Sequence, residues 1–407
     1  MTEHRAWAPL RTRAFRALWI ANLVSNVGTV MHTVGAGWAM TSLTASPAVV
    51  ALAQVAWSVP GFLFALPAGA LADLFDRRVV MRASQIVAMC IAALFGVLHL
   101  TGHLGVVALL AGTFLLSVSL TLSAPIFSAI IPDLVAPDDV PQAIGLNSVA
   151  YNGAQSLGPA LGGVLVAAAG PAAVFLLNAV SFLGIVAVAG GWPARADHDD
   201  SERPLAAMRA GISHVRHDRR LAPIALRITL AFFASSAIVA LLPVVARTRL
   251  RAEAWQFGLL SASLGAGVVV AVMVQPRLRG RMRTDSTVFV ASALWAVGAA
   301  VLGWTTHLAV AIPALLLAGT GAMLTSNTMW SLFLLRTPAR VRGRASSISM
   351  LAVWLGTSVG AIAWGALASR TSVATALVGA AGLHLVVTAL ATLWLRLGDD
   401  DTGTVAA

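Results

Sequence analysis

The sequence predicts an all-α membrane protein in which twelve transmembrane helices form two six-helix bundles. Two features of the composition lead to this prediction. Of the 407 residues, 58% are hydrophobic and 11% are charged, against about 25% charged residues in typical soluble domains. The mean hydropathy is +0.84. Because lipid offers no hydrogen-bond partner to free backbone groups, such a chain is expected to cross the membrane as helices of about 20 residues.

Twelve apolar stretches are long enough to span a bilayer. The first follows an arginine-rich N-terminus, but it is too long for the apolar core of a cleavable signal peptide. One long polar stretch predicts an N-terminal bundle (1–192), a central cytoplasmic loop (193–222) and a C-terminal bundle with a short cytoplasmic tail (223–407). The predicted spans are 16–40, 48–72, 82–101, 104–130, 143–169, 171–192, 223–246, 255–276, 286–306, 308–334, 346–369 and 371–396.

The distribution of arginine predicts the orientation in the membrane. If the N-terminus is cytoplasmic, 23 of the 27 arginines lie in cytoplasmic segments and 4 lie outside. Cytoplasmic loops retain positive charge, so both termini are expected in the cytoplasm. Two loops depart from this pattern: the acidic loop 131–142 and the basic outside loop 247–251. The net charge of +11 is spread over short clusters between spans, and it therefore does not indicate nucleic-acid binding.

The two halves of the chain form a weak repeat. An offset of 202 residues places Ala143 on Ala345, and it also aligns Ser156 with Ser358, Gly158 with Gly360 and Gly163 with Gly365. Four identities in helices rich in small residues could arise by chance. Together with the six-plus-six layout, they favour two parallel repeats.

Polar residues recur on one face of several predicted spans, at the spacing of three and four that places them together on a helix. Polar groups are costly against hydrocarbon, so these faces are expected either to line a central cavity or to bond neighbouring helices. The cavity candidates are Asn22, Asn26, Thr29 and His32 in the first span, Asn147, Tyr151 and Gln155 in the fifth, Arg227 in the seventh, Asn327 and Trp330 in the tenth, and Trp354 in the eleventh.

The charged turn between the second and third spans carries Gly69, Asp73, Arg77 and Arg78. This spacing resembles the loop signature of the major facilitator superfamily. The resemblance implies a latch on the cytoplasmic side, in which the glycine permits close helix approach and the aspartate pairs with arginine. Leu74 and Asp76 replace the basic residue and the glycine that are usual in the family, which weakens the latch assignment. The alternative is an ordinary basic turn on the cytoplasmic side.

A second motif lies in the fifth span, where Gly158, Pro159, Gly162 and Gly163 stand in the run GPALGG. It resembles the exporter-associated motif of the same superfamily. Small residues let helices pack closely and proline permits a bend, so a packing seam without any link to transport direction is the alternative. Residues 124–163 further resemble the branch that includes enterobactin exporters and macrolide efflux proteins.

The sequence gives little indication of how transport is coupled to protons. No Asp or Glu lies in the middle of a predicted span, so His32 and His384 are the titratable candidates at membrane depth. For His384 a packing role is favoured, whereas for His32 the two roles are evenly balanced. Arg227 is expected to reach the cytoplasmic surface or to attract an anionic substrate.

These features predict a secondary active transporter of the bacterial inner membrane that works by alternating access. The resemblance implies export of an amphipathic small molecule, such as a drug, a macrolide or a siderophore, driven by protons. The alternatives are an importer of a small nutrient and a receptor or scaffold that does not transport. Because the sequence has no phosphate-binding loop, no cluster of metal ligands and a single cysteine, Cys90, no enzyme activity, cofactor or metal is expected. The expected partners are the substrate, the lipid bilayer and protons, and the protein is expected to be a monomer.

Overall fold

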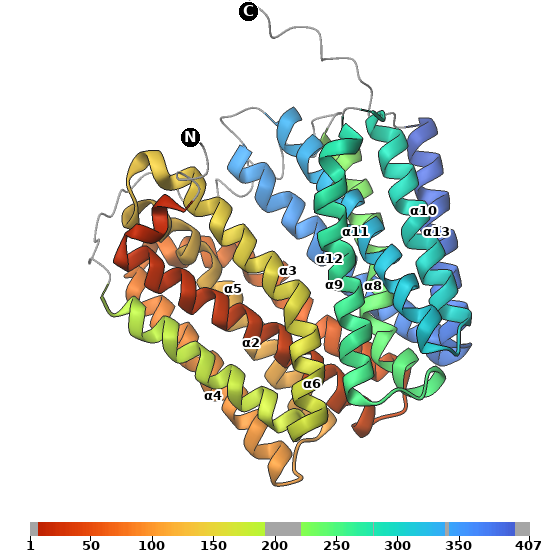
Figure 1. Ribbon diagram of the computed structural model, residues 1–407, viewed down its shortest axis with the longest axis horizontal. Helices are drawn as coiled ribbons and strands as arrows, with labels where there is room; N and C mark the ends of the chain where they lie inside the picture. The colour runs from red at the N-terminus through yellow and green to blue at the C-terminus, as the bar shows by residue number, and fades with distance from the viewer. Residues whose placement is uncertain (1–6, 192–220, 280, 338–341, 395–407) are drawn as a thin grey trace, which may run out of the picture. The chain divides into compact units, whose positions relative to one another are not determined.

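The computed structural model is helical throughout the parts of the chain that it describes, which are residues 7–191, 221–279, 281–337 and 342–394 (Figure 1). The predicted central loop lies almost entirely outside these ranges, and the predicted C-terminal tail lies wholly outside them. The first half of the chain contains η1 (Ala8–Arg11), α2 (Arg13–Leu43), α3 (Pro47–Leu74), α4 (Arg77–Leu100), α5 (Val106–Leu134), η2 (Pro137–Asp139) and α6 (Val140–Ala189). The second half contains α8 (Leu221–Val244), the π-helical turn η3 (Val245–Arg249), α9 (Ala254–Arg279), α10 (Thr284–Trp304), α11 (Leu308–Arg336), α12 (Arg342–Arg370) and α13 (Val373–Trp394).

Helix α6 contains two of the predicted spans, which meet at Gly170. This residue has φ 77° and ψ 169°, a conformation outside the helical region. Pro171 follows, and a residue before proline is pushed away from the helical conformation. A positive φ with an extended ψ is open in practice to glycine alone. The break predicted between residues 169 and 171 is therefore confirmed.

The all-helical membrane fold is confirmed, with about twelve spans when the two parts of α6 are counted separately. Within the described residues, ten helices are long and apolar enough to cross a membrane. Helix α2 is not among these ten, although it has 31 residues. Its polar face, which includes Asn22, Asn26 and His32, lowers its hydropathy without shortening it. For α2, helix length therefore predicts a membrane span better than hydropathy does.

Two pairs of helices begin 202 residues apart, which is the offset that the sequence identities gave. Helix α5 begins at Val106 and α11 begins at Leu308, 202 residues later, and both have 29 residues. The same offset relates Val140, where α6 begins, to Arg342, where α12 begins. Independent helix boundaries thus support the repeat more strongly than four identities between small residues do.

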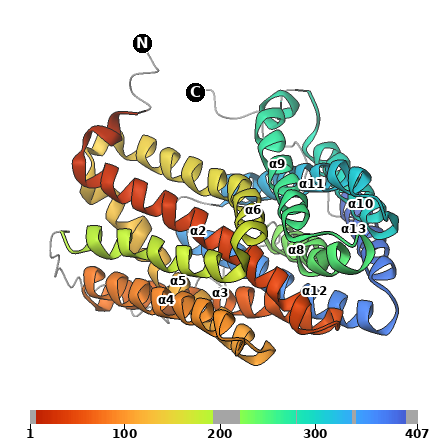
Figure 2. The ribbon, with the colours of Figure 1, turned by 60° about the horizontal axis from the view of Figure 1, so that its bottom comes forward.

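Contacts between helices divide the chain into two compact units. The first contains α2, α4, α5, α6, most of α3 and the first turns of α9; the second contains α8, α10, α11, α12, α13, the start of α3 and most of α9. In the first unit α6 packs along α2 and α4 (Figures 1 and 2). In the second unit α10 packs between α11 and α13, while α8 packs on α12. The bundle boundaries 1–192 and 223–407 stay a prediction.

Replacing Gly170 with alanine should destabilise the protein, because the new Cβ would be forced into a conformation that costs about 1–3 kcal/mol. The expected result is a lower apparent melting temperature of the purified protein in detergent. Gly145→Ala is the matched control, since Gly145 is an exposed helical residue of α6 whose added Cβ meets nothing within 4 Å. That substitution should be neutral or stabilising by up to about 1 kcal/mol. Equal melting temperatures for the two variants would contradict the strained kink.

Candidate functional site

The predicted polar faces of α2 and α6 meet in the first unit. Asn22 Nδ2 donates to Asn147 Oδ1 at 2.7 Å, and Trp19 Nε1 donates to the Leu146 carbonyl at 2.9 Å. Hydrogen bonds of this kind between membrane helices stabilise the bundle by about 0.6 kcal/mol each on average. Asn22 and Asn147 were predicted from helical spacing alone, and the structure places them in contact. They therefore bond α2 to α6, whatever else they contact during transport.

Further along the same interface, the site includes a residue that the sequence analysis missed. Thr29 Oγ1 lies 3.5 Å from Asn178 Oδ1, and Ser181 Oγ donates to the Asn178 carbonyl at 2.7 Å. The Asn178 side chain is fully buried. Gly28 makes this possible, because a Cβ there would lie 2.8 Å from Asn178 Oδ1. A lone asparagine in an apolar span was the available signal, since a polar side chain in lipid needs a partner.

His32 lies in an aromatic environment rather than in a row of polar groups. Its ring centroid is 5.4 Å from that of Phe95 and 4.8 Å from that of Phe175. The residue is 1% exposed, and neither ring nitrogen has a hydrogen-bond partner among the described residues. This environment favours packing over contact with substrate. A role in proton exchange stays a prediction.

The other cavity candidates are distributed over both units. In α6, Tyr151 is 53% exposed, and its hydroxyl accepts a hydrogen bond from Gln155 Nε2 at 3.1 Å. In the second unit, Asn327 Nδ2 donates to Gln275 Oε1 at 3.0 Å and so joins α11 to α9. Three further candidates are partly buried and stay predictions as cavity residues: Asn26, Trp330 and Trp354.

The GPALGG run of α6 packs against α2. A Cβ on Gly158 would lie 2.8 Å from Val30, and a Cβ on Gly162 would lie 2.9 Å from the Cα of Met31. Pro159 and Gly163 are also buried. The small residues therefore let two helix backbones approach each other closely in the first unit. A role in export stays a prediction.

In the charged turn between α3 and α4, Asp76 and Asp133 pair with two arginines. Asp76 is the N-cap of α4: its Oδ1 accepts from the Arg78 backbone N–H at 2.8 Å, and its Oδ2 pairs with the Arg78 guanidinium at 3.1 Å. Arg77 lies 3.9 Å from Asp133, near the end of α5. Asp133 belongs to the acidic loop 131–142, so this loop supplies a partner to the basic turn. Gly69 and Asp73 lie in α3, but the Asp73 side chain is outside the described residues, so the latch stays a prediction.

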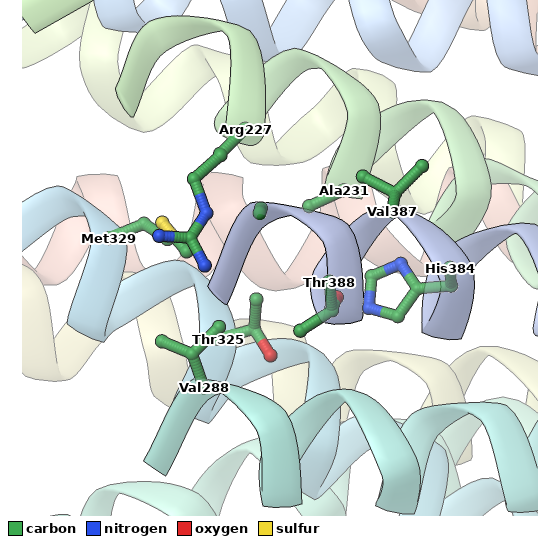
Figure 3. Close-up of a pocket in the computed structure, with 9 residues that line it drawn as sticks. Arg227, Ala231, Val288, Thr325, Met329, His384, Val387 and Thr388 are labelled. Atoms are coloured by element: carbon green, nitrogen blue, oxygen red, sulfur yellow. The ribbon is translucent and has the colours of Figure 1, made fainter. Parts of the chain in front are cut away.

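The second unit contains a buried charge pair. Arg227 is 4% exposed, and its Nη1 lies 3.5 Å from Oδ1 of Asp285, in the first turn of α10. The guanidinium therefore does not reach a surface in this structure, contrary to the first of its two predicted roles, whereas attraction of an anionic substrate stays a prediction. Around it, side chains from α8, α10, α11 and α13 enclose a small cavity lined by Arg227, Ala231, Val288, Thr325, Met329, His384, Val387, Thr388 and Ala391 (Figure 3).

Comparison with known proteins assigns the family. A sequence model for transmembrane secretion effectors, a family of the major facilitator superfamily, matches residues 4–406. The chain belongs to this family. The transporter is 25% identical to the enterobactin exporter of Citrobacter koseri over 393 residues, which covers 92% of this chain and 90% of the relative. Identity to the enterobactin exporter of Salmonella choleraesuis is also 25%, with the same coverage.

Solved structures show the same fold at lower identity. A bacterial homologue of the human lysosomal transporter Spinster has a TM-score of 0.76 and 13% identity, covering 96% of this transporter and 98% of the other chain. A bacterial homologue of the iron transporter ferroportin has a TM-score of 0.72 and 19% identity, covering 93% and 98%. These structures show the fold, and the family model that matches residues 4–406 confirms the expected superfamily. The protein is a multi-pass membrane transporter of small molecules and not an enzyme.

The Asp76 cap leads to a prediction for this transporter. Hydrogen bonds from Arg78 hold the pKa of Asp76 below its ordinary value of 3.8. A carboxyl whose pKa is lowered by folding stabilises the folded state above its unfolded pKa, and this contribution is lost as the pH falls through the folded pKa. Asp76→Ala should therefore lower the apparent melting temperature at pH 7, and the difference from the wild type should disappear as the pH falls below 3.8.

Asp76→Asn is the matched variant for this test. Asparagine also caps helices, so it should keep more of the stability at pH 7 than alanine does. Melting curves of the three proteins in detergent, recorded between pH 3 and pH 7, provide the comparison. A difference between wild type and Asp76→Ala that is the same at every pH would show that the carboxylate does not act as described.

Proposed function

We propose that the protein exports amphipathic small molecules from the bacterial cytoplasm by alternating access, using the proton gradient across the inner membrane. The observation that carries this proposal is the similarity to enterobactin exporters along 92% of the chain. Relatives that match over nearly the whole length share all the spans from which a transport path is built. The family description, a secretion effector, points in the same direction.

The proposed substrates are a drug, a macrolide or a siderophore. The polar faces of α2 and α6 support this class, because Asn22, Asn147, Tyr151 and Gln155 offer neutral hydrogen-bonding groups beside apolar surface. Ligand sites in proteins combine mainly apolar walls with a few such polar groups. The distribution of arginine, with 23 residues on one side and 4 on the other, supports cytoplasmic termini.

The competing proposal is import of a small nutrient. The buried pair of Arg227 and Asp285 favours it, since charged residues inside a bundle can bind a charged substrate. Asp285, however, is the second residue of α10 and lies at the end of its span rather than in the middle. A receptor or scaffold has weaker support, because the longest polar stretch, 193–222, is short for a signalling domain.

Transport in inside-out membrane vesicles tests the direction and the coupling. A panel of a fluorescent amphipathic cation, a macrolide and a catecholate siderophore should include at least one compound that the vesicles accumulate when the protein is present and a proton gradient is imposed. An ionophore that collapses the gradient should abolish this uptake. Uptake that survives the ionophore would rule out proton coupling, and uptake by right-side-out vesicles alone would support the importer.

A second prediction concerns the proposed latch. If Asp73 pairs with arginine only when the cytoplasmic side is closed, Asp73→Asn should change the rate of the transport cycle but not the affinity for substrate. An ion pair near the surface stabilises one conformation by up to about 1 kcal/mol, so the change should be at most about fivefold. Initial rates over a range of substrate concentrations separate the maximal rate from the Michaelis constant.

Asp138→Asn serves as the control for Asp73, because Asp138 is an exposed acid in η2. This variant should transport at the wild-type rate with the wild-type Michaelis constant. If Asp73→Asn instead raised the Michaelis constant and left the maximal rate unchanged, Asp73 would belong to the substrate site and the latch assignment would be wrong.

A further inference from the structure

The small cavity of the second unit has the size of a single water molecule. Its volume is about 10 Å³. This is close to the smallest cavity, about 10–15 Å³, that can hold a water molecule. Side chains from four helices converge on it: Arg227 from α8, Val288 from α10, Thr325 from α11, and His384 with Thr388 from α13 (Figure 3). The cavity is too small for a transported substrate.

Two polar atoms at this cavity are buried and need a partner. Thr325 Oγ1 and His384 Nε2 have no hydrogen-bond partner among the described residues. The Thr388 hydroxyl lies beside them, and it donates to Ser292 Oγ at 3.1 Å. A buried polar group without a partner destabilises the folded protein, and buried water molecules commonly supply the missing bonds. The lining therefore offers a water molecule the polar partners it requires.

The charge state of His384 depends on the charged residues of the helices that surround the cavity or pack on α13. Helix α8 contributes Arg227 and α10 contributes Asp285, which pairs with Arg227. In α11 and α12 the charged residues stand at the helix ends: Arg336, Arg342, Arg344 and Arg370. On the side facing α10, the His384 ring packs against Trp295, with the ring centroids 4.8 Å apart. Arg227 and His384 are thus the ionisable residues of the cavity lining.

We propose that the cavity binds one water molecule joining Thr325, Arg227 and His384, and that His384 is the proton-binding residue of the second unit. The step is a simple transfer: a hydronium ion gives its proton to His384 Nε2, an N–H bond forms, and water remains. The reverse transfer returns the proton to water on the other side of the membrane. This inference rests on the proposed proton-driven export, for which it supplies a carrier.

Protonation would change the electrostatics of the cavity. Asp285 pairs with Arg227, and a neutral His384 adds no charge to the cavity lining. An imidazolium then faces a guanidinium across one water molecule, and the described residues that line the cavity include no carboxylate. Like charges in a low-dielectric interior repel strongly. Proton binding should therefore favour a conformation in which water enters the site, which links protonation to the transport cycle.

Nuclear magnetic resonance of the full-length protein in nanodiscs tests this site without any substrate. With ¹⁵N-labelled histidine, His384→Gln identifies the signals of His384 among the nine histidines. As the pH falls from 8 to 4, these signals in the wild type should change from those of neutral imidazole to those of imidazolium. Thr325→Val removes the hydroxyl that holds the water, and it should lower the protonated fraction of His384 at a given pH by about fivefold, equivalent to one hydrogen bond.

Two controls keep this test decisive. Thr325→Ser retains the hydroxyl and should behave as the wild type. Thr320→Val makes the same exchange on α11 outside the cavity lining, where Thr320 Oγ1 donates to the Leu316 carbonyl at 2.8 Å, and it should leave the His384 signals unchanged. Signals of His384 that are constant from pH 8 to pH 4, or that respond equally in the two valine variants, would overturn the proposal.

The result can be separated from the test of export. If the vesicles transport a compound in a proton-dependent way but His384 does not titrate, export stands and the proton is carried elsewhere. If His384 titrates and responds to Thr325→Val while transport is independent of protons, the site exists and the proposed coupling falls. The two measurements therefore fail independently.

Discussion

The fold depends on one constraint: inside a bilayer, every polar group must find its partner within the protein. Backbone groups meet this requirement by forming helices, and polar side chains meet it where helices touch. Asn22 with Asn147 in the first unit, and Asn327 with Gln275 in the second, are bonded in this way. Because unpaired polar groups are so costly in this environment, each one that is buried without a partner among the described residues needs an explanation of its own.

The helices could be predicted because this constraint acts directly on sequence. A charge-free run of about 20 residues has few alternatives to a membrane helix. The break in α6 was predicted at the same place, and the structure supplies its cause: Gly170 has a positive φ and is followed by Pro171. Side-chain partners were harder to predict. Helical spacing placed Asn22 on the correct face, but Asn178 stands alone in an apolar run, and its contact with Thr29 depends on the packing of two helices far apart in sequence.

The charged residues show where sequence reasoning reaches its limit. Asp76 was treated as a departure from a family pattern, although its position before α4 is that of a helix N-cap. Arg227 was expected to reach the cytoplasmic surface or to attract an anionic substrate. Its pairing with Asp285 was missed, because the two residues are 58 positions apart in sequence and no local spacing predicts the pair. His32 was placed in a polar row by its spacing, whereas the rings of Phe95 and Phe175 that surround it come from other helices. Helical spacing identifies which residues share a face, whereas the packing of the helices determines which side chains that face contacts.

Comparison of the two repeats explains why the water-sized site belongs to one unit. At the offset of 202 residues, Thr325 corresponds to Ser123, whose hydroxyl donates to the Leu120 carbonyl at 2.9 Å and lies 3.3 Å from Gln85 Nε2. His384 corresponds to Phe182, a fully buried apolar side chain. The first unit thus satisfies or removes the polar group at each of these two positions. It retains buried polar atoms elsewhere, such as the ring nitrogens of His32, but in the second unit the two groups line one water-sized cavity and can share a single ligand.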